Sequence, residues 1–186
     1  MLKILILFFL PVSISGQTLR FEFTQNKMGS PFRIIFYCDD SLKATHISNT
    51  CFMMVDSLNK IFSDYDSTSE ISKLSKMAYA KPQKISDELM RLLLLSKNAS
   101  QKSAGTYDIT IGSLTRLWRI SKRQKVFPSP FSIDSAKKLT GFHQLLIDTT
   151  NQTLSFAIPG IQLDFGGIVK GYAAQKVIDY LLSQHI

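Results

Sequence analysis

Residues 163–172 carry the side chains that a binding site for an anionic ligand needs. Their order predicts a short apolar strand over 161–165, then a pair of glycines, then a helix that contains Lys170. The glycines let the backbone approach a ligand closely, and the start of a helix offers unpaired N–H groups to an anion. Asp164 can accept hydrogen bonds at the strand end, and Lys170 can neutralise a phosphate. A structural turn explains the same residues, so this segment alone leaves both interpretations open.

Two other segments combine aromatic, acidic and small residues in a similar way. Residues 62–74 form a polar, tightly turned stretch that contains Tyr65, which suits a binding loop. Residues 103–114 follow a helix with small residues and Asp108, and then enter another helix. Each segment taken singly is also explained as a connection between secondary-structure elements.

The composition predicts a single globular domain. The chain has 186 residues, 45% hydrophobic and 11% aromatic, which is enough apolar material for one core and is not a disordered composition. The net charge of +8 suits nucleic acid, an anionic membrane surface or an anionic cofactor. We expect no nucleic-acid partner, because no nucleic-acid-binding motif accompanies the charge. The densest basic cluster, interpreted as a solvated loop face, is Arg116, Arg119, Lys122, Arg123 and Lys125.

Residues 1–16 have the layout of a secretory signal peptide. Lys3 is followed by seven large apolar residues, then by Pro11 and small residues up to Gly16. The apolar run is too short for a lasting membrane anchor. We therefore expect an exported bacterial protein, periplasmic or at the periplasmic face of the inner membrane, whose domain occupies residues 17–186.

Hydrophobic periodicity predicts an α+β fold. We expect one sheet, built from two hairpins and the strand over 161–165 and covered by the two long helices. Export permits a disulfide between Cys38 and Cys51, although Cys51 fits the apolar stripe of a helix and is interpreted as a core residue. The expected elements are a hairpin of residues 19–24 and 31–37, helices over 41–62, from Ser69, over 87–103, ending at Trp118 and over 132–141, a hairpin of residues 145–147 and 153–158, and a last helix with Val169, Ala173, Val177, Ile178 and Leu181 on one face.

Taken together, in this order and spacing, the segments resemble the ApbE family, the FAD:protein FMN transferases. The matching pieces are Met28-Gly29-Ser30, residues 62–74, residues 105–112 with Leu117-Trp118, and residues 163–174. The resemblance extends from about residue 20 to the end of the chain. It implies a single ApbE-like, T-fold-like α+β domain.

The resemblance also implies roles for individual residues. We expect Met28 to touch FAD and Tyr65 to pack on the flavin ring. Asp164 and Lys170 are expected to be further FAD contacts, and Gly167 is expected to help hold Mg²⁺ through its backbone carbonyl. The segment expected to wrap the cofactor is Thr106, Tyr107 and Asp108.

The family reaction transfers FMN from FAD to a threonine hydroxyl of an acceptor flavoprotein subunit or domain, with release of AMP and assistance from magnesium. Members of the family continue past the point where this chain ends, at Ile186. The chain therefore resembles an N-terminal portion, incomplete at the C-terminus, and we expect the catalytic groups and the remaining metal ligands beyond Ile186. A fragmentary sequence is the favoured explanation, and a truncated, inactive gene is the alternative.

Two other functions stay open. One is an FAD-binding protein or FAD pyrophosphatase without transferase activity. The other is an exported basic interaction module with no cofactor, in which the glycine turn is only structural. Association with the inner membrane is expected for the transferase.

Overall fold

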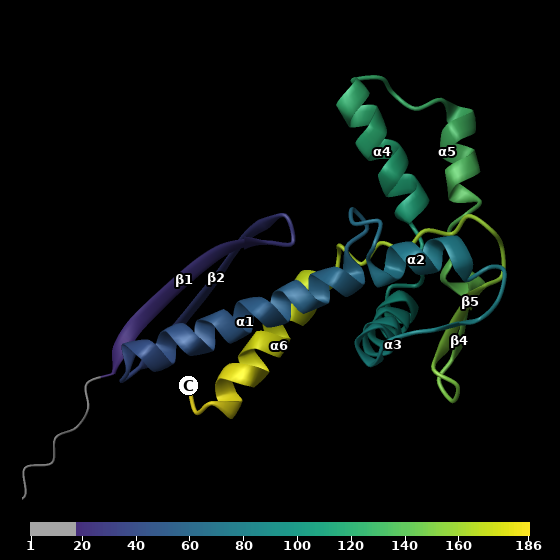
Figure 1. Cartoon of the computed structure of the whole chain (residues 1–186). Helices are drawn as coiled ribbons and strands as arrows, with labels where there is room; N and C mark the ends of the chain where they lie inside the picture. Colours follow the sequence, from purple (N-terminus) through teal and green to yellow (C-terminus); the bar gives the residue numbers. More distant parts are fainter. Residues whose placement is uncertain (1–17) are drawn as a thin grey trace, which may run out of the picture.

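The computed structural model describes residues 18–186, so the expected signal peptide at 1–16 lies outside the described residues. The chain contains both helices and strands, which confirms the mixed α and β composition (Figure 1). The elements are β1 (Leu19–Lys27), β2 (Ser30–Cys38), α1 (Ser41–Phe62), α2 (Glu70–Met77), β3 (Gln83–Lys84), α3 (Asp87–Lys102), α4 (Gly112–Gln124), α5 (Pro130–Lys137), a 3-10 turn η1 (Phe142–Gln144), β4 (Leu145–Asp148), β5 (Thr153–Phe156) and α6 (Val169–Ser183).

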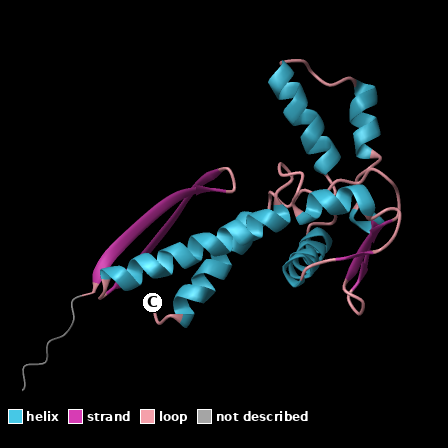
Figure 2. Ribbon diagram, viewed as in Figure 1, coloured by secondary structure: helices cyan, strands magenta, loops and turns pink. Residues whose placement is uncertain are grey.

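The β1–β2 hairpin packs against the long helix α1 and against α6, which runs beside α1 (Figure 2). The strands pair antiparallel from Leu19 opposite Cys38 to Lys27 opposite Ser30. Met28 and Gly29 form the turn, and both have positive φ, as tight hairpin turns require. The apolar layer between hairpin and helices contains Ile34, Phe36 and Cys38 of β2, Ile47, Cys51 and Val55 of α1, and Val177 of α6.

Cys51 is a core residue, as the sequence predicts. It is fully buried on α1, and burial raises the pKa of its thiol to about 11. Cys38 is also buried, and neither cysteine forms a disulfide. The disulfide that export permits is therefore not present, and the two thiols act as small apolar side chains.

The second core lies around α2, α3 and the sheet with strand order β3-β5-β4. Helix α6 joins this core through its first turns, where Val169 and Ala173 are buried. On the same helix, Tyr172 donates a hydrogen bond to Glu88 of α3, and Lys176 forms an ion pair with the same carboxylate at 2.8 Å. Burial and the neighbouring Glu88 raise the pKa of Tyr172 to about 12. Helix α6 is thus attached to both cores.

The single sheet expected from the sequence is wrong, because the structure contains two separate sheets. The expected strand over 161–165 is also wrong. The side chains of Ile161, Leu163 and Phe165 are buried, as expected for a strand. However, Gln162 forms only an isolated parallel bridge with Ile111. No further strand pairing follows the bridge, because the partner segment enters helix α4 directly after Ile111.

Two helix boundaries and the position of one residue of α6 also differ from expectation. Helix α4 continues past Trp118 to Gln124 and ends at Lys125, whose φ of 56° is left-handed. Helix α5 begins before Ser132, because Ser129 caps it and a proline occupies its first turn. On α6, Ile178 points away from the core and is 47% exposed.

The backbone contact that fixes the start of α4 makes a testable prediction. A Cβ on Gly112 would lie 2.5 Å from the carbonyl oxygen of Gln162, which belongs to the backbone and cannot move aside alone. We expect Gly112→Ala to lower the free energy of unfolding by about 1–3 kcal/mol, measured by urea denaturation. Gly171→Ala is the matched control, because its Cβ meets no atom within 4 Å and alanine favours a helix. Equal stability of the two variants would contradict this packing.

Candidate functional site

A cavity of about 540 Å³ lies where the turn of the β1–β2 hairpin, the end of α1 and the start of α6 meet. Four of the eight residues predicted from the sequence line it: Met28, Tyr65, Asp164 and Lys170. These residues come from three segments that are far apart along the chain: the β1–β2 turn, the loop after α1, and the stretch from Asp164 to Lys170. The fold thus brings half of the predicted set to one place.

The β1–β2 turn and the start of α6 lie on two sides of this cavity. Met28 is half-buried in the hairpin turn, and Lys170 of α6 donates a hydrogen bond to the Ser30 hydroxyl at 3.0 Å. This bond ties the start of α6 to the hairpin. Between them, Phe62 at the end of α1 packs edge-on against Phe165, with ring centroids 5.2 Å apart. The aromatic pair forms an apolar base beside the polar groups.

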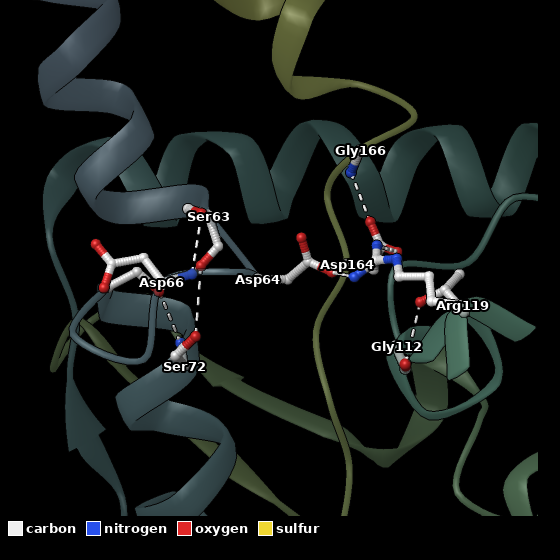
Figure 3. Close-up of polar contacts among 10 residues, drawn as sticks. Ser63, Asp64, Asp66, Ser72, Gly112, Arg119, Asp164 and Gly166 are labelled. Carbon is white, nitrogen blue, oxygen red and sulfur yellow. Dashed lines mark hydrogen bonds and ion pairs between the residues drawn. The ribbon is translucent and has the colours of Figure 1, made fainter. Parts of the chain in front are cut away.

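Hydrogen bonds among Ser63, Asp66 and neighbouring serines hold the loop after α1 (Figure 3). Ser69 donates to the Ser63 carbonyl at 2.6 Å, and the Asp66 N–H donates to the Ser63 hydroxyl at 3.2 Å. Asp66 accepts hydrogen bonds from Thr68, and these bonds lower the pKa of its carboxyl group. Ser69 also caps α2, as the sequence predicts.

Arg119 of α4 is the centre of the polar network (Figure 3). Its guanidinium pairs with Asp64, and its second nitrogen lies 3.3 Å from Asp164. The same group lies over the Tyr65 ring, 4.2 Å from the centroid. Asp164 also accepts from the Gly166 N–H at 2.8 Å. Burial opposes the charge of Arg119, but the bond to Asp64 and the surrounding negative groups outweigh it and raise the pKa of Arg119.

Arg119 corrects the interpretation of the basic cluster as a solvated loop face. Arg116, Arg119 and Arg123 line a second cavity of about 710 Å³, which also contains Lys76 and three serine hydroxyls. Asp64, Tyr65 and Arg119 border both cavities. The sequence places Arg119 just after a helix expected to end at Trp118, and this is why its role in the site was not predicted. The helical spacing of the three arginines is the signal that points to a shared face.

The remaining predicted residues lie outside the first cavity. Thr106 is exposed, and the Asp108 carboxylate accepts from the Thr110 backbone N–H at 2.8 Å and from its hydroxyl at 2.7 Å, which shapes the loop. The Tyr107 ring lies behind the glycine turn, 3.3 Å from where a Cβ of Gly167 would stand.

The Tyr107 hydroxyl is buried, and burial raises its pKa. Ser96 lies close enough to moderate that rise, but the two oxygens do not reach hydrogen-bond geometry. The structure thus places Tyr107 and Gly167 together, with Gly167 exposed and the Tyr107 hydroxyl buried.

The described residues suit the flavin better than the metal. A stackable tyrosine, a cation at a helix start and a glycine turn suit FAD. In contrast, residues 18–186 hold no group of three or more His, Cys, Asp or Glu side chains able to bind a metal ion. Asp64 and Asp164 are both paired with Arg119, and Gly167 offers only its backbone. These residues alone do not form a magnesium site.

The ion pairs of Arg119 predict a measurable coupling. In a double-mutant cycle of Arg119→Met and Asp64→Asn, we expect an interaction free energy of about 1 kcal/mol from urea denaturation, because the pair is only partly exposed. Arg123→Met is the control, since Arg123 lies on the same helix without an ion pair in the described residues. It should couple to Asp64→Asn by less than about 0.5 kcal/mol. No difference between the two cycles would refute the proposed network.

The chain is similar to known proteins over most of its described length. The sequence profile of the ApbE family matches residues 28–186. An FAD:protein FMN transferase from Chlamydia muridarum is 35% identical over 118 residues, which are 63% of this chain and 37% of the relative. One from Klebsiella pneumoniae is 28% identical over 159 residues, which are 86% of this chain and 49% of the relative.

Solved structures share the fold. The flavinyl transferase ApbE from Pseudomonas stutzeri, in its apo form, superposes with a TM-score of 0.79 at 28% identity, covering 90% of this chain and 53% of that one. The flavin transferase ApbE from Vibrio cholerae gives a TM-score of 0.83 at 24% identity, covering 91% of this chain and 55% of that one.

The chain spans about half the length of the longer matches. The matched region nevertheless includes every residue predicted for the site, together with both cavities. Because the family profile covers most of its length, the chain belongs to the ApbE family.

Proposed function

We propose that the protein is an FAD:protein FMN transferase, which moves FMN from FAD to a threonine hydroxyl of an acceptor protein. The observation that carries this proposal is the meeting of Met28, Tyr65, Asp164 and Lys170 around one cavity in a chain of the ApbE family. In the reaction, the threonine oxygen forms a bond to the phosphorus of the FMN half. The bond from that phosphorus to the AMP oxygen breaks, and the hydroxyl proton leaves.

The described residues serve to bind and orient the substrate. The Tyr65 ring is 79% exposed, so it offers a face on which a flavin ring can stack once Arg119 moves aside. Lys170 and Gly166 line the same cavity, and the Lys170 ammonium group can neutralise the charge of the pyrophosphate. An anionic substrate would compete with Asp64 and Asp164 for Arg119, so binding should rearrange these ion pairs.

Three further features belong to the proposal. Magnesium dependence rests on the family resemblance, since the described residues do not form a metal site. Export to the periplasm and association with the inner membrane rest on residues 1–16 and on the family. In the described part of the chain, no helix is both long and apolar enough to cross a membrane.

One incubation separates the transferase from the alternatives. Full-length protein is mixed with FAD and Mg²⁺, with and without a candidate acceptor domain, and products are followed by mass spectrometry. We expect FMN attached to the acceptor and AMP in solution. Free FMN plus AMP without attachment would identify a pyrophosphatase, and absence of flavin binding would favour an interaction module. An acceptor with its target threonine changed to alanine is the control.

Stacking on Tyr65 gives a separate prediction. We expect Tyr65→Ala to weaken FAD binding by about 1–2 kcal/mol, the scale of an aromatic contact, in a fluorescence titration. Tyr37→Ala is the matched control, because Tyr37 is 61% exposed on β2 and does not line the cavity. Unchanged affinity in Tyr65→Ala, with an intact fold, would assign Tyr65 a structural role only.

A further inference from the structure

Helices α4 and α5 form a hairpin that projects from the rest of the molecule (Figures 1 and 2). We define the hairpin tip as residues 122–131, which include the end of α4, the connecting loop and the start of α5. Two features fix the shape of this tip. Lys125 ends α4 in a left-handed conformation, and Pro130 sets the backbone of the first turn of α5. The tip is therefore a defined, convex structure.

Large apolar side chains are exposed at the tip. The exposed fraction is 63% for Val126, 77% for Phe127 and 81% for Phe131. Trp118, one turn below on α4, is 43% exposed and packs edge-on against Phe127, with centroids 5.1 Å apart. Single exposed apolar residues need no explanation, but a group of four at the most projecting point indicates an interaction surface.

The same region is strongly basic. Residues 109–133 contain five Lys or Arg and no Asp or Glu. Lys122, Arg123 and Lys125 lie at the tip, and all three are exposed. None of the three forms an ion pair with another residue of the 18–186 range. Aromatic and aliphatic side chains surrounded by unpaired cations are typical of protein segments that lie in the interface of an anionic bilayer.

We propose that the hairpin tip docks peripherally on an anionic phospholipid surface. Val126, Phe127 and Phe131 enter the headgroup region, and Lys122 and Lys125 contact the lipid phosphates, while Arg123, which also lines the second cavity, adds to the positive charge of the tip. A convex tip suits a deformable lipid layer, whereas a protein partner would need a matching hollow with acidic walls. Helix α4 is about 20 Å long, so docking holds the cavity at its base within about that distance of the bilayer. The docking itself requires neither FAD nor an acceptor.

Trp118 is the single tryptophan of residues 1–186, so in this chain its emission reports on the hairpin. The chain of residues 1–186 is titrated, without FAD, with vesicles that contain phosphatidylglycerol and with vesicles of phosphatidylcholine alone. We expect a blue shift of the emission and co-sedimentation only with the anionic vesicles, both reduced by added salt. Equal binding to both vesicles, or to neither, would overturn the proposal. A shift that depends on protein concentration without lipid would overturn it in favour of a second copy of the chain.

Variants at the tip, each compared with a matched variant elsewhere, test whether vesicle binding occurs through the tip. Val126→Ser with Phe131→Ser keeps the contact between Trp118 and Phe127, and should weaken binding at least about tenfold. Its control is Leu42→Ser with Met53→Ser, two apolar residues that are equally exposed on α1.

The charge of the tip is tested in the same way. Lys122→Glu with Lys125→Glu should also weaken binding on the order of tenfold. The control is Lys43→Glu with Lys81→Glu, which makes the same change in net charge away from the tip. Equal loss in a variant and its control would refute docking through the tip.

Discussion

The guanidinium of Arg119 joins three parts of the chain that no strand connects. It pairs with Asp64 in the loop after α1 and with Asp164 before α6, while it lies over Tyr65. Charge-assisted hydrogen bonds to two carboxylates hold these loops at fixed separations. The shapes of both cavities therefore depend on this group, because Asp64, Tyr65 and Arg119 border each of them.

Backbone contacts place Asp164 where Arg119 can reach it. The Asp164 N–H donates to the Ile109 carbonyl at 2.8 Å, and the Gly112 N–H donates to the Gln162 carbonyl at 3.1 Å. These two bonds join the start of α4 to the segment before α6 without forming a sheet. Because Gly112 lacks a side chain, the two segments approach closely, and Arg119 extends from the same helix toward the carboxylate. The close contact between Gly112 and Gln162 therefore sets both the packing of α4 and the position of Arg119 in the site.

Local signals explain what the sequence predicted well. Helix α1 has the expected bounds because Asp40 caps it and its apolar stripe is continuous. The turn after Asp164 was predicted because two adjacent glycines separate an apolar segment from a helical pattern. The position of Arg119 depends instead on long-range pairing with Asp64 and Asp164, which no periodicity encodes. Likewise, the sequence does not show that one oxygen of the Asp108 carboxylate accepts from both the backbone N–H and the hydroxyl of Thr110.

The central claim is that the cavity bounded by Met28, Tyr65, Asp164 and Lys170 holds FAD. The most direct measurement is a crystal structure of the full-length protein with FAD bound. We expect the flavin ring against Tyr65, the pyrophosphate near the glycine turn and Lys170, and the Arg119 side chain moved away from Asp164. FAD bound elsewhere, with the ion pairs of Arg119 unchanged and this cavity empty, would contradict the account.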